Sequence, residues 1–310
     1  MPAISNDLSA IAVDVLKLRF SQLLINEHLK KSAFRIPVHL ALGHEAIAVA
    51  LARTLNPQDA KVLSHRNLHY NLAFGSPLAS IIDEFYLKET GLAGGQLGSM
   101  NLSNADVGVI YTSSILGNNL PVAAGVALAE QLRDSDAVTA VVTGDGAMEE
   151  GAFYESLLLM STFRTSAMVI IENNGWSLAT EIAQRRCPID VAGLAKSVGA
   201  PFYSLAGNST AAYIETLQEA RKNAVGGHTP VVIEVELKTL GDWRMINVEN
   251  PNGKYINYHA GTAPKVELSD DALLTNSGDD PVHVLVQQLG EQLLAEMATD
   301  VLAQLKREIA

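Results

Sequence analysis

The sequence predicts an α/β protein in which a mostly parallel sheet is covered by helices on both faces. Short apolar runs alternate with longer amphipathic stretches, which is the order expected of β-α-β units. The runs are almost continuously apolar, as strands buried on both faces are. The three clearest runs occupy residues 138–143, 167–172 and 231–235, and the stretches between them occupy about 149–162 and 209–225.

Composition limits the class of protein. The 310 residues are 48% hydrophobic and 18% charged, which suits one large α/β domain or a domain with an appendage. A net charge of −12 argues against a surface that binds nucleic acid or an anionic membrane. The single cysteine, Cys187, excludes an internal disulfide and indicates a reducing compartment. The first ten residues do not resemble a signal peptide and no apolar run is long enough to span a membrane, so we expect a cytoplasmic protein.

The N-terminal part is predicted to be helical. Residues 7–30 carry apolar side chains at three-to-four spacing after Asp7, a plausible N-cap. A second short helix opens at residues 43–47 and is closed by Asn56-Pro57. In the segment 61–75, a short apolar lead runs into Ser64-His65-Arg66, which places a cation at a loop.

Two further segments precede the first clear β-α-β unit. Residues 91–98 contain four glycines, a run that lets backbone amides approach a ligand. Residues 113–130 predict a loop that enters a helix rich in Ala and Gly, which should pack closely against another surface.

The C-terminal part continues the alternation and then departs from it. Asp190 is predicted to cap a helix that ends at Ser197, and a strand is predicted at 201–205. Residues 239–265 predict a surface loop rich in Gly, Asn and Pro. Residues 277–281 predict a hinge-like linker before one final amphipathic helix at 282–307, so we divide the chain into a domain at 1–265 and a linker with a C-terminal helix at 266–310.

Polar side chains follow two of the predicted strands. Gly144-Asp145-Gly146 ends the first, and Asn173-Asn174-Gly175-Trp176 ends the second. The carboxyl ends of neighbouring parallel strands meet at one edge of a sheet, where ligands bind. Asp145 and Asn174 are hard oxygen donors that suit Mg²⁺, whose remaining positions are usually filled by phosphate oxygens and water.

A Gly-Asp-Gly turn alone is common and more often structural, but its spacing here points to a cofactor. Residues 147–172 separate Gly146 from Asn173, which leaves room for a helix and a return strand. The pattern resembles the thiamin diphosphate motif, in which GDG is followed by NN after about 25 to 30 residues.

The resemblance extends over about residues 8 to 238. The segments GHEAIAVAL, SHRNLHYNLAFG, LGSMNL, ILGNNLPVAAGVALA and GDGAMEEGAFYESL resemble the alpha subunit of the thiamin diphosphate-dependent first component of 2-oxoacid dehydrogenases, the family of the pyruvate, branched-chain and acetoin enzymes. It implies a thiamin diphosphate-binding fold. It also implies that Asp145, Asn174 and the carbonyl of Trp176 ligate Mg²⁺.

The same resemblance assigns residues to the cofactor. Arg66 matches the arginine that grips the diphosphate, with His65 beside it; the alternative for Arg66 is a surface ion pair. Gly144 completes the motif, and the backbone N–H groups of Gly146 and Ala147 would face the phosphates. Backbone groups of Ser114 and Leu116 match positions that meet the aminopyrimidine ring, unless they only pack the loop. We interpret His44, His69 and His228 as structural or solvated residues.

The resemblance also implies a partner chain. Thiamin catalysis requires a glutamate on the aminopyrimidine, and in this family it lies on a beta subunit. The expected assembly has two alpha and two beta chains, with the cofactor at each interface. The helix at 117–130 and the terminal helix are candidate contacts, although packing within the core explains either equally well.

One region departs from the dehydrogenases. Their alpha chains carry a His-Gly-His-Ser loop after the strand at 231–237, whereas this chain has LKTLGDWRMINVEN. The segment from His259 to Pro264 is instead similar to a His-Gly-x-Ala-Pro segment of transketolases. His259 is therefore a candidate catalytic residue with His65, and its alternative is a solvated loop histidine. The altered loop puts acyl transfer to a lipoyl acyltransferase in doubt.

The leading functional hypothesis is an oxidoreductase subunit that uses thiamin diphosphate and Mg²⁺ to decarboxylate a small, pyruvate-like 2-oxo acid. The acyl unit would pass to lipoamide or to an aldehyde. One alternative is a split transketolase-like subunit, for which Lys254 and Lys265 would form only a small phosphate-binding cluster. The other is a non-catalytic scaffold subunit, against which the intact Asp145, Asn174 and Arg66 argue.

Overall fold

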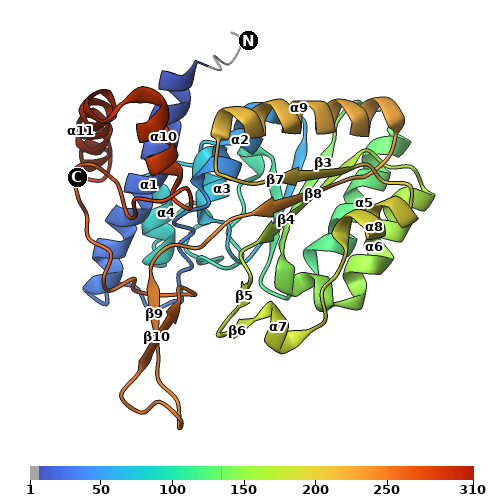
Figure 1. Ribbon diagram of the computed structural model, residues 1–310. Coiled ribbons are helices and arrows are strands. Elements are labelled where there is room, and N and C mark those ends of the chain that lie inside the picture. The colour runs from blue at the N-terminus through green and yellow to red at the C-terminus, as the bar shows by residue number, and fades with distance from the viewer. Residues whose placement is uncertain (1–6, 134) are drawn as a thin grey trace.

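A parallel sheet forms the centre of the molecule (Figure 1). The computed structural model describes residues 7–133 and 135–310. Within them, six strands pair in the order β2-β1-β3-β4-β8-β7, and every pairing is parallel. The strands are β1 (Ala60–Ser64), β2 (Val109–Ser113), β3 (Thr139–Gly144), β4 (Ala167–Asn173), β7 (Phe202–Leu205) and β8 (Val231–Glu236).

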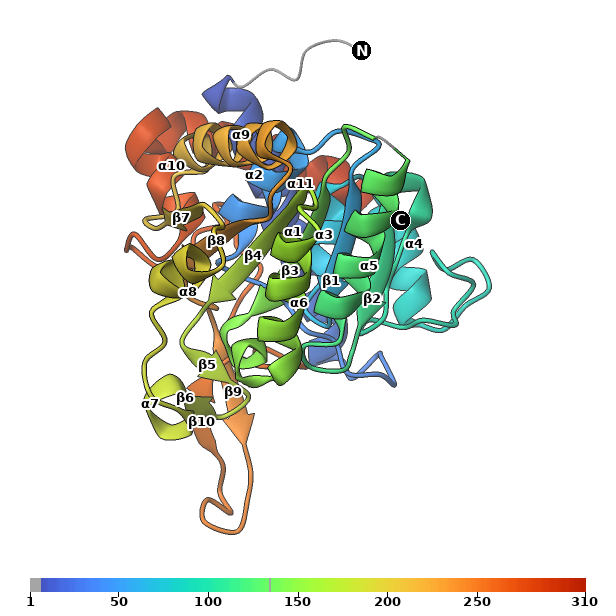
Figure 2. The same ribbon diagram turned by 90° about the vertical axis from the view of Figure 1, so that its right-hand side faces the viewer.

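Alternate strand residues pack on opposite faces because successive side chains in a strand point in opposite directions. On one face, Val141 and Val169 join a buried cluster with α5 (Asn119–Leu132), α6 (Gly151–Thr162) and α8 (Val191–Ser197). On the other, Val142 and Ile170 join a larger cluster with α1 (Leu8–Lys30), α2 (Glu45–Thr54) and α9 (Thr210–Gly227). Figure 2 shows the two helical layers on either side of the sheet, which confirms the predicted fold class.

Up to β8, the predicted helices and strands are confirmed with small shifts of their ends. Asp7 is the N-cap residue of α1, and Asp190 caps α8 by accepting a hydrogen bond from the N–H of Gly193 at 2.9 Å. The sequence did not predict β2 or α4 (Leu78–Phe85). The short helix α3 (Leu68–Ala73) follows β1 and the loop that carries Arg66.

The glycine run at 91–98 binds a carboxylate, but this carboxylate is a side chain of the same protein. The carboxylate of Glu84, at the end of α4, is buried and accepts hydrogen bonds from four backbone N–H groups. The expectation of an external ligand at this run is therefore corrected. An added Cβ at Gly95 would lie 2.5 Å from the backbone of Leu87, so the close approach needs glycine there.

The C-terminal segment differs from the single helix that we predicted. Gly290, at φ +87°, separates α10 (Pro281–Leu289) from α11 (Glu291–Glu308). The segment before α10 is anchored to the N-terminal helices, because Asp280 is fully buried and pairs with Arg19 of α1 at 2.8 Å. Arg19 also pairs with Glu45 of α2 at 2.8 Å, so one guanidinium joins three helices.

Two hairpins extend the carboxyl side of the sheet. The predicted loop at 239–265 contains an antiparallel pair, β9 (Asp242–Met245) and β10 (Lys254–Asn257), which projects from the body as an arm (Figures 1 and 2). The second hairpin, β5 (Trp176–Ser177) and β6 (Thr180–Glu181), leads into the short helix α7 (Ile182–Arg185). Among the described residues, no helix is both long and apolar enough to cross a membrane.

Candidate functional site

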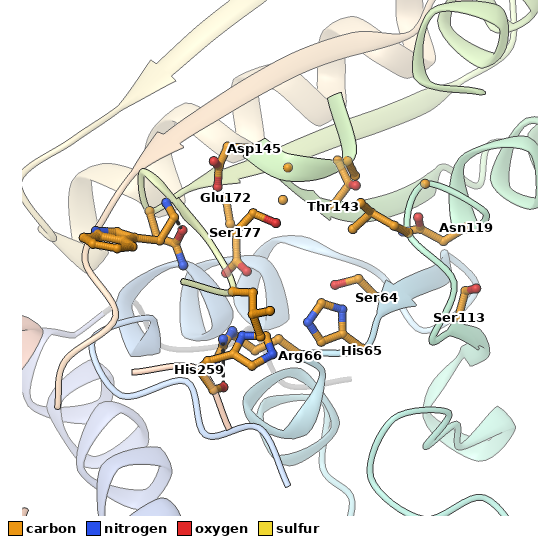
Figure 3. A pocket seen from close by; sticks show the side chains of 18 of the residues that line it. Ser64, His65, Arg66, Ser113, Asn119, Thr143, Asp145, Glu172, Ser177 and His259 are labelled. Carbon is orange, nitrogen blue, oxygen red and sulfur yellow. Dashed lines mark hydrogen bonds between the residues drawn. The ribbon is translucent and has the colours of Figure 1, made fainter. Parts of the chain in front are cut away.

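A pocket lies at the carboxyl edge of the sheet, where β1, β3 and β4 end (Figure 3). It holds about 670 Å³ of empty space, open solvent included. In the sheet, β1 lies between β2 and β3. The chain passes from β1 to β2 on one side and then returns to β3 on the other side, so the strand order reverses at β1. Ligands of parallel sheets bind at such a switch point. Of the residues predicted from sequence, the pocket is lined by His65, Arg66, Leu116, Gly144, Asp145, Gly146, Ala147, Asn174, Trp176 and His259.

Asp145 begins a 3-10 turn directly after β3 and is buried. Its Oδ2 accepts a hydrogen bond from Nη2 of Arg185 at 2.7 Å, and the same guanidinium also contacts Glu149. Burial raises the pKa of Asp145, and Arg185 opposes that shift. A buried carboxylate needs a cation or hydrogen-bond donors beside it, and here α7 supplies a cation.

Asn174 follows β4 on the other side of the pocket. Its Oδ1 accepts a hydrogen bond from the backbone N–H of Trp176 at 2.9 Å, and its Nδ2 donates to Oγ1 of Thr239 at 2.9 Å. A carboxylate, an amide oxygen and a backbone carbonyl are all hard oxygen donors. The set of Asp145, Asn174 and Trp176 therefore fits Mg²⁺ in chemical type.

Close packing joins the two halves of the motif. A Cβ added at Gly146 would lie 2.9 Å from Oγ of Ser177. The turn after β3 therefore contacts the β5–β6 hairpin without room for a side chain. Gly146 thus has a packing role in addition to the backbone role predicted for it.

Arg66 is buried in the loop after β1, so the alternative of a surface ion pair is wrong. Its Nη1 donates to the carbonyl of Leu40, and its Nη2 donates to the carbonyl of His259 at 3.1 Å. Burial lowers the pKa of Arg66. The guanidinium therefore ties the segment that carries His259 to the pocket; contact with a diphosphate stays a prediction.

His259 and His65 face the same pocket, and a third imidazole, that of His39, packs against both. The ring centroids of His65 and His259 are 6.2 Å apart, and that of His39 lies 4.9 Å from His65 and 5.1 Å from His259. Burial, with Arg66 adding to it, lowers the pKa of His65 and of His259 to about 4. Both imidazoles are therefore neutral at pH 7, and His259 is half-buried rather than fully solvated.

The loop after β2 differs in detail from the prediction. Leu116 lines the pocket, but Ser114 is exposed outside the lining and donates its N–H to Oδ1 of Asn101 at 3.1 Å. Ser113 and Ile115 line the pocket in its place. Contact of the Ser114 backbone with a cofactor stays a prediction.

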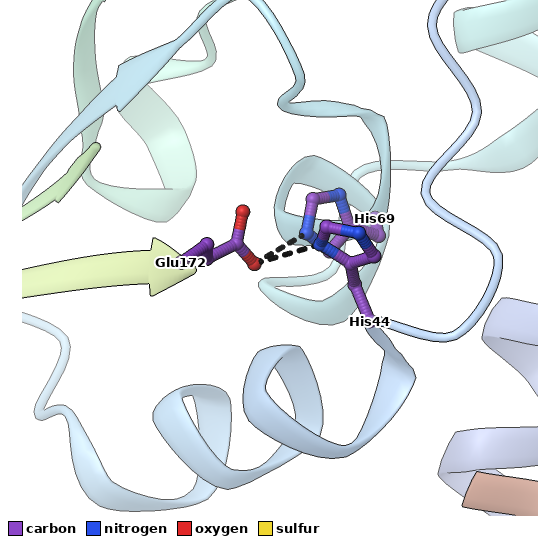
Figure 4. A group of neighbouring side chains, drawn as sticks. All are labelled: His44, His69 and Glu172. Carbon is purple, nitrogen blue, oxygen red and sulfur yellow. Dashed lines mark hydrogen bonds and ion pairs between the residues drawn. The ribbon is translucent and has the colours of Figure 1, made fainter. Parts of the chain in front are cut away.

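Sequence reasoning missed a buried carboxylate, Glu172, at the end of β4. Its Oε1 lies 3.1 Å from Nδ1 of His44 and 3.4 Å from Nε2 of His69, and it accepts a hydrogen bond from the hydroxyl of Tyr70 at 2.8 Å (Figure 4). Burial would raise the pKa of Glu172, but His44 and His69 hold it well below its usual range. The signal was an acidic residue within an otherwise apolar strand, since a buried carboxylate requires partners.

The ligand atoms of His44, His69 and Glu172 lie within 4.8 Å of one another, a separation that a metal ion could bridge. The carboxylate is already satisfied by three hydrogen-bonding groups, so the cluster needs no ion. His44 and Glu172 also line the main pocket. The predicted structural role of His44 and His69 is consistent with these contacts, and His228 is exposed at the end of α9.

The fold and the pocket define a class, the parallel α/β proteins that gather oxygen donors at a switch point. Solved transketolases share this fold. The enzyme from Pichia stipitis gives a TM-score of 0.56 at 16% identity over 98% of this chain and 47% of its own. The enzyme from Campylobacter jejuni gives 0.54 at 14% identity over 98% of this chain and 49% of its own.

The sequence places the chain more narrowly. The family model of the dehydrogenase E1 component matches residues 16–238, and the chain belongs to that family. It is 30% identical to the alpha subunit of acetoin:2,6-dichlorophenolindophenol oxidoreductase from Bacillus subtilis, over 64% of this chain and 59% of that protein. It is 28% identical to the pyruvate dehydrogenase E1 alpha subunit from Acholeplasma laidlawii, over 64% of this chain and 55% of that protein. The matches thus span less than two thirds of these relatives.

Proposed function

We propose that this chain is the alpha subunit of a thiamin diphosphate- and Mg²⁺-dependent enzyme that decarboxylates a small 2-oxo acid. The observation that carries the proposal is that Asp145 and Asn174, at the ends of adjacent strands, line one pocket with Arg66, His65 and His259. Thiamin diphosphate, when bound, supplies the electron sink that lets a 2-oxo acid lose carbon dioxide. A cytoplasmic location remains part of the proposal.

The residues of this chain would divide the work. Asp145, Asn174 and the carbonyl of Trp176 would hold Mg²⁺, and Arg66 would neutralise diphosphate charge. His65 and His259, neutral at pH 7, would hydrogen-bond the substrate without repelling Arg66. A beta subunit would supply the glutamate that contacts the aminopyrimidine, in an assembly of two alpha and two beta chains.

The acceptor of the acyl unit remains open between lipoamide, which would require a lipoyl acyltransferase, and an aldehyde. The position of His259 in the pocket also favours a second candidate, a transketolase-like transfer of a ketol unit. Lys254 and Lys265, close to His259 in the sequence, would form only a small phosphate-binding cluster for that candidate. Nζ of Lys265 pairs with Asp242 at 2.9 Å and lies over the ring of Tyr255, so its charge is already balanced.

The test is to co-purify the chain with the product of the adjacent gene and to supply thiamin diphosphate, Mg²⁺ and either 2-oxo acids or ketose phosphates. Release of carbon dioxide from a 2-oxo acid is expected, with loss of most activity in Asp145→Ala. The matched control is Asp300→Ala, which removes an exposed carboxylate of α11. Turnover of ketose phosphates alone would favour the transferase. Full activity in Asp145→Ala would favour the non-catalytic scaffold.

A further inference from the structure

A chain of hydrogen bonds connects Asn174 to the buried carboxylate of Glu172. It runs from Nδ2 of Asn174 to Oγ1 of Thr239 at 2.9 Å, then to Nε2 of His44 at 2.8 Å. It ends between Nδ1 of His44 and Oε1 of Glu172 at 3.1 Å. We propose that Thr239 and His44 are positioning residues that fix the amide of Asn174 with its oxygen available to a divalent cation. This inference rests on the proposed function, because it concerns the same metal ligand.

The first end of the chain fixes the orientation of the amide. The backbone N–H of Trp176 can only donate, so the Asn174 atom 2.9 Å away must be the oxygen Oδ1. The other amide atom, Nδ2, therefore faces Thr239 and donates to its hydroxyl. Because Oγ1 accepts from Asn174, its own proton is free to point at His44.

The second end of the chain is compatible with the same direction. An ionised carboxylate only accepts hydrogen bonds, so Nδ1 of His44 carries the proton that lies toward Glu172. With the proton on Nδ1 alone, Nε2 is an acceptor and receives the proton of Thr239. In this tautomer every proton in the chain points from Asn174 toward Glu172.

Packing holds the members of this chain in place. Thr239 and His44 are buried, with 4% and 1% of their surfaces exposed. The turn before α2 lies directly against the segment after β8: the N–H of Leu240 donates to the carbonyl of Leu42 at 2.8 Å, and an added Cβ at Gly43 would lie 2.2 Å from the carbonyl oxygen of Lys238. The side chains of His44 and Thr239 therefore meet through backbone contacts that leave little freedom.

The consequence for a cation follows from the two lone pairs of Oδ1. One accepts the N–H of Trp176, and the other remains for a metal ion. A flipped amide would direct its NH₂ group at the N–H of Trp176 and at the cation, and it would leave Thr239 without a donor. The chain to Glu172 opposes that flip, as hydrogen bonds to metal ligands commonly do.

The test measures metal binding rather than turnover. The full chain, with its partner if the two co-purify, is titrated with Mn²⁺ in the presence of thiamin diphosphate, and free Mn²⁺ is followed by electron paramagnetic resonance. Thr239→Val removes the hydroxyl at nearly constant volume, and we expect its dissociation constant for Mn²⁺ to rise about 10- to 100-fold. Thr239→Ser keeps the hydroxyl and is expected to restore binding to within about threefold of wild type. Circular dichroism of each variant reports folding.

The outcomes separate this inference from the proposed function. A wild-type chain that binds no Mn²⁺, or binds it as tightly after Asp145→Ala, overturns the proposed metal site and the positioning role with it. Metal binding that depends on Asp145 but is equal in wild type and Thr239→Val overturns the positioning role alone. If Thr239→Val does not fold, Thr239→Ser provides the test. A folded Thr239→Ser that loses more than about threefold in Mn²⁺ affinity, although it keeps the hydroxyl, contradicts the role of the hydroxyl.

A double-mutant cycle tests the contribution of His44. His44→Phe removes both ring nitrogens, and its effect on Mn²⁺ affinity should pass through Thr239. We therefore expect His44→Phe to weaken binding in wild type but to add less than about twofold in the Thr239→Val background. Fully additive effects would show that His44 acts separately and would contradict the connected chain.

Discussion

Nη2 of Arg185 lies 2.7 Å from Oδ2 of Asp145, so an internal cation holds one oxygen of the carboxylate that is proposed to bind Mg²⁺. Both side chains are largely buried, at 11% and 3% exposure, which keeps the ion pair out of bulk water. The helix α7 and the proposed metal ion would therefore compete for the same group.

The first prediction concerns this competition. Arg185→Gln should raise the affinity for Mg²⁺ by about fivefold, which corresponds to about 1 kcal/mol, because Mg²⁺ would no longer have to displace the guanidinium from Asp145. Isothermal titration with Mg²⁺ and thiamin diphosphate measures the change. Arg164→Gln, on an exposed arginine after α6, is the matched control. Equal or weaker Mg²⁺ binding by Arg185→Gln would show that the two cations do not compete.

The second prediction concerns the carboxylate of Glu84 and acid stability. Burial would raise the pKa of Glu84, but its four backbone hydrogen bonds outweigh burial and lower it. The stabilisation is therefore complete above the unfolded-state pKa of about 4.3 and is lost as the pH falls through the lower folded-state pKa. Glu84→Gln should lower the free energy of unfolding by about 1–3 kcal/mol at pH 7.

Urea unfolding at pH 7 and at pH 3 measures this effect. The difference between wild type and Glu84→Gln should shrink at the lower pH, whereas Glu89→Gln, on an exposed side chain, should change neither value. A difference that stays constant with pH would mean that the charge of Glu84 does not contribute.

The third prediction uses two glycines in contrasting surroundings. At Gly43, φ is +94° and an added Cβ would meet a backbone carbonyl, so Gly43→Ala should destabilise the protein by more than about 1 kcal/mol. Gly125 lies within α5 with nothing within 4 Å of an added Cβ, so Gly125→Ala should stabilise it by about 0.5–1 kcal/mol. Thermal unfolding of both variants gives the sign of each change. Similar midpoints for the two would contradict the close contact at Gly43.

The fourth prediction compares two neighbouring aspartates. Asp280→Ala removes one of the two carboxylates that pair with the buried Arg19, which should lower the free energy of unfolding by about 3–5 kcal/mol. Asp279→Ala removes an ion pair with Lys238 in which both side chains are well exposed. This variant should change the free energy of unfolding by less than about 0.5 kcal/mol. Chemical unfolding of both variants measures the difference. Equal effects would mean that the buried pair contributes no more than a surface pair.

The sequence predicted the strand ends well because each depends on a local pattern. An apolar run followed by Gly-Asp-Gly marks where β3 ends, and Asn173-Asn174 marks the end of β4. Parallel pairing then places Asp145 and Asn174 at one edge without further information. Local patterns placed His65, Arg66 and His259 only in loops, and the family resemblance gave them roles.

Contacts between distant residues could not be predicted in the same way. The contact between His44 and Glu172 joins residues 128 positions apart, and that between His44 and Thr239 joins residues 195 apart. Neither leaves a periodic signal. The break at Gly290 was hidden for a different reason: α10 and α11 are both amphipathic, so a single helix and two consecutive helices give similar patterns.

The buried guanidinium of Arg19 has a consequence for synthesis on the ribosome. Its partner Glu45 is synthesised soon after Arg19, but its other partner, Asp280, lies 261 residues after Arg19 in the chain. While translation proceeds, a nascent chain that has closed α1 against α2 pairs Arg19 with Glu45 but still lacks the carboxylate that accepts from Nη1 and Nη2 of Arg19. The hydrogen bonds of this guanidinium can therefore be completed only near the end of elongation. A prematurely terminated product would keep buried N–H donors without their acceptor, a defect that favours its removal by cellular proteases.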